Sequence, residues 1–289
     1  MSSNNAKKSR DERIIFSNVV VTRKRNLFLG RKWRSMDIKM GIGLLCFHVL
    51  TLFAPSTFTW DAFWIALFGY ILTGICGITM CYHRLLAHHS LKLPKWLEYT
   101  FAYLGVLAMQ RDPIYWVSIH RYHHQYVESE KDPHTPTFGF WFSHMGWILD
   151  SGFIMEKYQE RKNLGLGHLC MLGAVSPISF GIWVLGTYGG LHVTFLVNSA
   201  CHIWGKRVWK TDDLSKNNWW VALVTFGEGW HNNHHAFEYS ARHGLEWWQI
   251  DMCWYMICFL ESLGLATNVK LPTTAHKIKK SFASTNKSK

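Results

Sequence analysis

The sequence lacks the short motifs that mark the common soluble enzymes. It contains no GxSxG nucleophile elbow, no Walker A phosphate loop, no GxGxxG dinucleotide turn and no HExxH zinc motif. Its seven cysteines are an odd number and show no CxxC spacing, which argues against a disulfide framework or a zinc ribbon. We therefore interpret the cysteines as buried free thiols, and we look for the chemistry elsewhere.

Acidic residues are scarce, 19 against 31 Lys and Arg, and long parts of the chain carry no charged side chain. Residues 40–60 and 62–82 form two such stretches, and residues 163–205 form a longer one. A hydrocarbon layer about 30 Å thick takes roughly 20 helical residues, so the first two stretches predict one crossing each and the third predicts two. We expect a turn between the last two crossings near glycines 181–190. A buried soluble hairpin is the alternative, but two spans separated by a single Asp61 in a basic protein favour the membrane.

Basic residues gather before position 37, between positions 83 and 162, and from position 206 onward. By the positive-inside rule, both termini and the middle segment lie on the cytosolic side, and the two short connections face the other way. The net charge of +12 is then explained by topology and by contact with anionic lipid. No nucleic-acid-binding module accompanies it, so we expect a membrane-lipid partner and no nucleic acid.

The same pattern divides the chain into segments. We predict a basic cytosolic segment (1–37), a transmembrane hairpin (38–82), a cytosolic segment (83–162), a second hairpin (163–205), a cytosolic cap (206–272) and a disordered basic tail (273–289). The N-terminus lacks the pattern of a cleaved signal peptide, and Asp11 and Glu12 argue against an acid-poor transit peptide. The first span is therefore the expected insertion signal. Endoplasmic reticulum is the favoured location, with a plastid membrane as the alternative.

Histidine is abundant, with 17 residues, and eight of them form three clusters on the predicted cytosolic side. The clusters are HRLLAH with His83 and His88, HRYHH with His120, His123 and His124, and HNNHH with His231, His234 and His235. The spacing i, i+3, i+4 in HRYHH and HNNHH puts three imidazoles on one helical face. The first two histidines are five residues apart, about 140° around an α-helix, so they need either two metals or a local unwinding.

A fourth group, a pair of polar residues, completes the set at the cytosolic end of the last predicted span. Asn198 and His202 stand four residues apart, where polar side chains are costly unless they serve a site. Nine histidines and one asparagine are too many ligands for one six-coordinate ion, so we infer a dinuclear centre. Imidazole suits iron, copper, zinc or nickel, and the ligand types alone do not choose between them.

Other histidines are interpreted as ordinary core or surface residues: His48, His144, His168, His192, His243 and His276. His89 and His134 are left open. A ligand imidazole normally donates its distal N–H to an acceptor that fixes its tautomer, and Glu228, Asp132 and Asp112 are the nearby carboxylates in the sequence. We expect Glu228 to act in this outer role.

The three histidine clusters, in this order and spacing, resemble those of the membrane fatty acyl desaturases of the delta-9 acyl-CoA type. The resemblance extends through DPIYWVSIHRYHH, EKDPHTPTFGFWFSH, NSACHIWG, GEGWHNNHHAFEYSARHGLEWWQID and GLATNVKLP, over most of residues 32–272. The tail segments are most similar to the plant delta-9 desaturase-like branch. The resemblance implies an all-α integral membrane fold, with four transmembrane helices under a cytosolic helical cap that carries a di-iron centre.

The resemblance also assigns the site and its partners. It implies that the nine histidines bind two irons, that Asn198 holds one of them through water, and that Gln110 and Trp116 lie near the bend of a narrow acyl tunnel. The alternative for those two residues is ordinary polar and aromatic packing at the interface. The implied electron donors are cytochrome b5 and its reductase, as separate proteins because no haem domain is evident. Basic cytosolic surface suits such an acidic partner.

The expected reaction is oxygen-dependent desaturation of a fatty acyl chain on CoA or on a lipid. Hydroxylation or acetylene formation on the same centre is a close rival, and a non-catalytic metal-binding or metal-transporting membrane protein is a rival of another class. The family usually carries a longer segment between the His144 region and the third span than residues 152–163 provide here. An inactive paralogue is therefore a third hypothesis.

Overall fold

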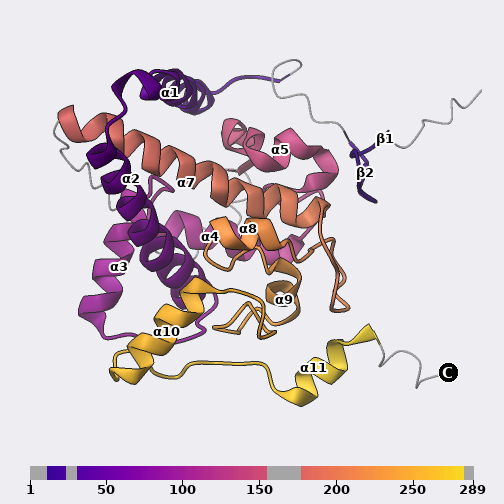
Figure 1. Cartoon of the computed structure of the whole chain (residues 1–289). Coiled ribbons are helices and arrows are strands. Elements are labelled where there is room, and N and C mark those ends of the chain that lie inside the picture. Colours follow the sequence, from indigo (N-terminus) through magenta and orange to yellow (C-terminus); the bar gives the residue numbers. More distant parts are fainter. Residues whose placement is uncertain (1–11, 24–30, 155–176, 283–289) are drawn as a thin grey trace, which may run out of the picture.

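The computed structural model describes residues 12–23, 31–154 and 177–282, and these residues are mostly helical (Figure 1). The N-terminal part contributes a two-stranded antiparallel ribbon, β1 (Glu12–Arg13) with β2 (Val20–Val21). The α-helices are α1 (Ser35–Leu52), α2 (Trp60–Leu72), α3 (Lys95–Leu107), α4 (Pro113–Tyr126), α5 (Phe140–His144), α7 (Pro177–Ile203), α8 (Trp219–Val224), α9 (His231–Ala236), α10 (Met252–Ser262) and α11 (Thr274–Lys280). A π-helix, η2 (Thr73–Ala87), continues α2, and short 3₁₀ turns are η1 (Ala54–Thr57), η3 (Pro136–Phe138) and η4 (Gly146–Leu149).

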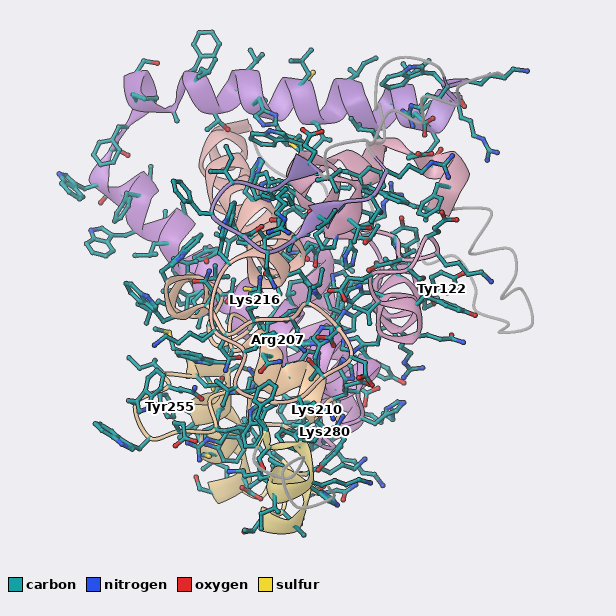
Figure 2. The ribbon with its side chains drawn as sticks, turned by 90° about the vertical axis from the view of Figure 1, so that its right-hand side faces the viewer. Tyr122, Arg207, Lys210, Lys216, Tyr255 and Lys280 are labelled. Atoms are coloured by element: carbon teal, nitrogen blue, oxygen red, sulfur yellow. The ribbon has the colours of Figure 1, made fainter. Side chains whose placement is uncertain are left out.

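Two of the described segments are long and apolar enough to cross a bilayer, Ser35–Ser56 and Trp60–Ala87. The first covers most of the uncharged stretch 40–60, and the second contains the uncharged stretch 62–82. Many apolar side chains of α1 and α2 face outward; Leu45 is 63% exposed on α1 and Phe68 is 66% exposed on α2. Figure 2 shows α1 lying across the top of the molecule, with α2 descending from its end. Exposed apolar surface of this extent is typical of a membrane protein.

The third uncharged stretch differs from expectation. The turn predicted near glycines 181–190 is wrong, because α7 runs without interruption from Pro177 to Ile203. Glycine is common in apolar membrane helices, where neighbouring helices compensate for its low helix propensity. At Gly190 the absence of a side chain allows close packing, because a Cβ there would lie 3.4 Å from the ring of Tyr70 on the adjacent α2. The remainder of the predicted second hairpin, and the short segment after Gly152, fall largely outside the described residues.

The π-helix η2 resolves the spacing problem of the first histidine cluster. A π-helix bonds residues five apart, and the backbone N–H of His88 donates to the carbonyl of His83 at 3.1 Å. The two rings consequently lie on the same side, with centroids 4.8 Å apart. Of the two alternatives that the sequence left open, local unwinding is therefore present.

Close packing of η2 against α3 fixes the position of this unusual helix. Gly77 of η2 approaches α3 so closely that an added Cβ would meet the backbone nitrogen of Gly105 at 2.5 Å. The core around it contains Met80, Cys81 and Tyr82, all with no measurable exposure. Helix η2 is therefore held on its apolar face while its C-terminal end presents the histidines.

The chain beyond residue 272 is partly ordered, contrary to the predicted disordered tail. Helix α11 begins after Thr273, whose hydroxyl accepts the N–H of His276 at 3.2 Å. Its C-terminal end returns to the body of the protein, where Lys210 N–H donates to the carbonyl of Lys280 at 2.8 Å (Figure 2). A helix N-cap and a bridge to residues 209–210 together explain this order.

Candidate metal centre

The first group of imidazoles contains five histidines, from the C-terminal end of η2 and the residue that follows it, from α4 and from α9. Their metal-ligating nitrogens all lie within 4.8 Å of one another: His83, His88, His120, His124 and His234. The Nε2 atom of His234 lies 3.1 Å from that of His83 and 3.0 Å from that of His124. We call this group the five-histidine set.

The second group contains four histidines, all buried: His123, His202, His231 and His235. The Nε2 of His231 lies 2.9 Å from that of His202 and 3.0 Å from that of His235. The Nε2 of His123 is buried without a hydrogen-bond partner. We call this group the four-histidine set. Together the two sets contain all nine predicted histidines and divide them as a dinuclear site requires.

Helix α4 serves both sets because its consecutive residues point in different directions. His123 belongs to the four-histidine set, whereas His124 belongs to the five-histidine set. Asp112 caps this helix by accepting the N–H of Tyr115 at 2.9 Å, and the helix begins with Pro113, a residue favoured at that position. Asp112, one of the carboxylates near the histidines in the sequence, is therefore a capping residue of α4.

Carboxylates lie beside the outer nitrogens of five of the nine imidazoles. The Nδ1–carboxylate distances are 2.5 Å for His83–Glu228, 2.9 Å for His123–Asp132, 3.2 Å for His124–Glu238, 2.9 Å for His202–Glu128 and 2.8 Å for His235–Asp213. This is the usual way in which proteins fix the tautomer of a ligand histidine. The outer roles expected for Glu228 and Asp132 are thus present. The sequence analysis did not identify three further carboxylates in this role, Glu128, Asp213 and Glu238. No local spacing in the sequence relates Asp213 or Glu128 to its histidine.

The geometry of the two sets fits metal ions. The Nε2 atoms of His83 and His124 both face that of His234 at close range. The Nδ1 of His83 lies against a carboxylate, an arrangement that leaves the lone pair on Nε2. Burial lowers the pKa of His234, and likewise that of His231, so these rings are neutral at pH 7 and available as ligands. Two nitrogens about 2.1 Å from a shared ion lie ~3.0 Å apart at an octahedral angle and ~3.4 Å apart at a tetrahedral one. Four Nε2–Nε2 separations of 2.9–3.1 Å match the octahedral value, and the fifth, between His88 and His120, is shorter at 2.7 Å.

Several histidines outside the sets behave as the sequence suggested. His144 contacts Ser199 and His192 at 3.1 Å each, and His276 lies 2.6 Å from the hydroxyl of Tyr239. His168 lies outside the described residues. His243 differs, because it groups with His83 and Glu228; His134, which the sequence left open, groups with His123 and Asp132. The interpretation of His243 as an ordinary core residue therefore needs revision.

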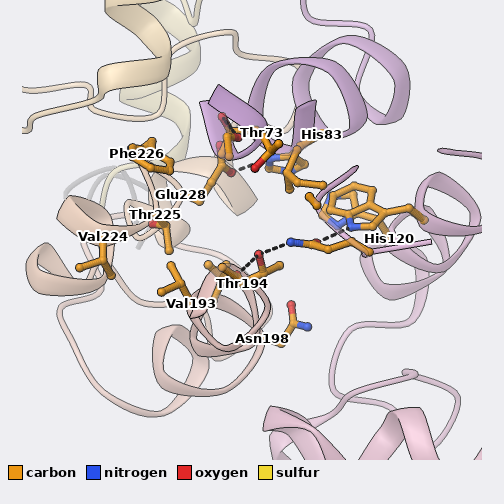
Figure 3. A pocket seen from close by; sticks show the side chains of 18 of the residues that line it. Thr73, His83, His120, Val193, Thr194, Asn198, Val224, Thr225, Phe226 and Glu228 are labelled. Carbon is orange, nitrogen blue, oxygen red and sulfur yellow. Dashed lines mark hydrogen bonds and ion pairs between the residues drawn. The ribbon is translucent and has the colours of Figure 1, made fainter. Parts of the chain in front are cut away.

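Two cavities adjoin the histidines. The inner cavity, of about 70 Å³, has His83 and His120 on one side and Val193, Val224 and Phe226 on the other (Figure 3). The outer chamber, of about 470 Å³, is bounded by one face of α1, the loop before α4, and α7. Five residues line both spaces: Gln110, Trp116, His120, Thr194 and Asn198. Asn198 lies apart from the other labelled side chains in Figure 3, so its predicted role through water stays a prediction.

A hydrogen-bonded bridge separates the two cavities. The Gln110 amide donates to Thr194 Oγ1 at 2.7 Å and accepts the indole N–H of Trp116 at 3.1 Å. The residues on either side of Gln110 have left-handed backbone, with φ of 57° at Met109 and 74° at Arg111. Non-glycine residues adopt this conformation at a cost and cluster at functional sites. Thr194 was missed, although a polar residue one turn before Asn198 in an uncharged helix was an available signal.

The site and the fold together indicate a class of protein. Two sets of buried imidazoles, each capable of holding a metal ion, sit beside an apolar cavity at the end of helices suited to a bilayer. Such an arrangement is typical of a membrane-bound metalloenzyme acting on an apolar substrate.

Comparison with known proteins defines this class further. Residues 58–159 match the model of the family described as fatty acid desaturase. The chain is 49% identical over 94% of its length to palmitoyl-monogalactosyldiacylglycerol delta-7 desaturase, chloroplastic, of Arabidopsis thaliana, and covers 79% of that protein. It is 50% identical to delta-9 acyl-lipid desaturase 1 of the same plant, over 88% of the chain and 90% of the relative. It is 48% identical to acyl-CoA C20 Delta5-desaturase of Anemone leveillei, over 94% of both. The chain belongs to the fatty acid desaturase family.

Proposed function

We propose that the protein is an oxygen-dependent acyl desaturase that introduces a cis double bond, of delta-9 type, into an acyl-CoA or acyl-lipid chain. One observation carries the proposal: imidazoles of both sets form part of the wall of the apolar inner cavity, through His83, His120, His123 and His231. An acyl segment in this cavity lies directly against both metal positions. The names of the relatives agree on desaturation and differ in position, with delta-5, delta-7 and delta-9 enzymes among them.

Two irons are the proposed cofactors, one in each histidine set, with Asn198 completing the four-histidine set through water. Bound iron supplies the redox chemistry with dioxygen that removal of hydrogen from two adjacent, unactivated methylene groups requires. The carboxylates keep the outer N–H of each partnered imidazole engaged, so that Nε2 faces inward. Each ligand is thereby held in one tautomer and one orientation.

The cavity walls provide selectivity, because a methylene chain offers no polar group to recognise. The bridge formed by Gln110, Thr194 and Trp116 restricts the passage between outer chamber and inner cavity, and so sets which carbon pair reaches the imidazoles. Much of the remaining inner wall is apolar, for example at Ile78 and Val197, and this disfavours water beside the acyl chain. A misplacement of about 1 Å can cost roughly a hundredfold in rate, so a rigid wall is a requirement of the reaction.

The same proposal extends to topology and partners. We propose four transmembrane helices under a cytosolic cap, with electrons delivered by cytochrome b5 and its reductase to the basic cytosolic surface. Endoplasmic reticulum is the proposed membrane, and a plastid membrane is the alternative that the chloroplastic relatives support. Microscopy of a fluorescent fusion in plant cells distinguishes the two locations.

The decisive experiment expresses the chain in a host that lacks its own desaturase, with mass spectrometry of cellular fatty acids and mapping of double-bond positions. The parent and a His276→Ala control, altered outside both sets, are expected to yield new monoenes, and His124→Ala is expected to yield none. Hydroxylated or acetylenic products would replace desaturation by the related reactions. Iron-loaded protein without any product, supplied with cytochrome b5 and varied acyl substrates, would favour an inactive paralogue.

A further inference from the structure

Two buried histidines outside the nine ligands occupy equivalent positions, one beside each set. His243 lies against Glu228, the carboxylate that holds His83 of the five-histidine set. His134 lies against Asp132, the carboxylate that holds His123 of the four-histidine set. Each metal position is therefore flanked by an imidazole–carboxylate–imidazole row, whose innermost ring is a ligand and whose outermost ring is not.

His243 is fixed tightly in this arrangement. It is 1% exposed, its backbone N–H donates to Asp251 Oδ2 at 2.8 Å, and its carbonyl accepts from Asn233 Nδ2 at 2.7 Å. Its Nδ1 lies 3.3 Å from Glu228 Oε2, the same oxygen that lies 2.5 Å from His83 Nδ1. Arg84 occupies the other oxygen, Oε1, at 3.1 Å. The outer imidazole therefore faces the one carboxylate oxygen that orients His83.

His134 repeats the pattern at the four-histidine set. It is 4% exposed, and its ring packs against that of His123 with centroids 4.3 Å apart. Its backbone N–H donates to Asp132 Oδ1 at 3.1 Å, and its Nδ1 lies 3.8 Å from the same oxygen. The second oxygen, Oδ2, accepts the N–H of Glu128 at 2.8 Å. Here too, one carboxylate oxygen lies near both a ligand imidazole and an outer imidazole.

The outer rings are costly to keep as they stand. Both ring nitrogens of His243 and the Nδ1 of His134 are buried without a completed hydrogen bond. Each such group costs roughly 1–3 kcal/mol, so an apolar residue would pack at lower cost. An imidazole at these places puts a ring nitrogen 3.3 Å from Glu228 Oε2 and 3.8 Å from Asp132 Oδ1, and its ring limits the space in which each carboxylate can move.

We propose that His243 and His134 are positioning residues, one for each metal position: His243 fixes Glu228 and thereby His83, and His134 fixes Asp132 and thereby His123. This inference rests on the proposed di-iron centre. Since the two rows share no residue, each outer histidine acts on one iron only. Changes to the partners of ligand histidines weaken metal binding by roughly 10- to 100-fold, and that effect is expected for one of the two irons in each case.

The test uses the full-length protein purified in detergent and loaded with ⁵⁷Fe. Iron content, the rate of extraction by a ferrous chelator, and Mössbauer spectra are compared for the parent, His243→Leu and His134→Leu. Each variant is expected to lose one iron about 10- to 100-fold faster than the parent and to alter one spectral component, a different component in each variant. His144→Leu is the matched control, since His144 is also buried but lies outside both rows, and it is expected to retain both irons at the parent rate.

Parent-like extraction and spectra in both variants would overturn the inference, and so would a change in the same component in both. If a leucine variant does not give a monodisperse protein, His243→Asn and His134→Asn remove the imidazole while keeping a polar group, and the same comparison decides. A parent chain that never holds two irons would overturn the di-iron centre itself, and with it this inference. Activity is not needed for any of these outcomes.

Discussion

Gly77 lies at the closest approach of η2 to α3, and adding one methyl group there tests how this contact positions His83. In Gly77→Ala the new Cβ would meet the nitrogen of Gly105 at 2.5 Å and the carbonyl carbon of Leu104 at 2.7 Å. These atoms belong to the backbone and cannot rotate away, so η2 and α3 must separate. Overpacking costs about 1–3 kcal/mol, and a clash with backbone belongs at the upper end. We expect a loss of about 3 kcal/mol, or roughly 6–12 °C in Tm.

The matched control for this change lies two turns earlier in the same continuous helix. An added Cβ on Gly69 meets no atom within 4 Å, so Gly69→Ala is expected to leave Tm unchanged or to raise it, because alanine favours a helix by up to about 1 kcal/mol. Thermal unfolding of purified protein, followed by size-exclusion chromatography, measures both variants, and iron content reports whether His83 keeps its place. Equal Tm and equal iron in the two variants would refute the proposed role of the η2–α3 contact.

Three further predictions concern buried charge, metal and the C-terminal helix. Arg84→Met leaves Glu228 and Asp251 buried without their common cation, so unfolding free energy should fall by about 3–5 kcal/mol, and an unchanged Tm would contradict this. Removal of metal by a chelator should lower Tm, and ferrous iron should restore it. For metal present at a hundred times its Kd, the lost stabilisation is about 2.7 kcal/mol. Identical Tm with and without metal would exclude a stabilising centre. Tyr239→Phe removes the hydrogen bond with His276, which is expected to reduce the stability of α11 against local unfolding by about 0.5–1.5 kcal/mol. Proteolysis near α11 should become faster, and iron content should not change.

The histidines proposed as ligands could be predicted from the sequence because their spacing is local. In HRYHH and HNNHH the helical period alone brings three rings to one region, and the structure divides them between the two sets as a dinuclear site requires. The carboxylates that contact these histidines could be predicted only in part. Glu128 reaches His202 and Asp213 reaches His235 through the folding of distant segments, for which no periodicity exists. His243 was interpreted as an ordinary residue for the same reason.

Backbone geometry was predicted less well than side-chain chemistry. The five-residue spacing of His83 and His88 indicated a departure from the α-helix, but the sequence could not choose between unwinding and separate metals. The glycines of α7 were taken as a turn because glycine breaks helices in water. In an apolar environment the backbone has no water to bond with, so a helix persists through them and uses their small size for contact with Tyr70.

The left-handed residues around Gln110 imply a compromise between stability and activity. Met109 and Arg111 each hold a conformation that costs a side-chain-bearing residue about 1–2 kcal/mol, and glycine at either position would remove that cost. The same substitution would free the loop that aims Gln110 at Thr194. A search for thermostable variants of this enzyme should therefore arrive at these positions early, and the gains in stability there should come with mixed products, as the acyl chain loses its fixed register.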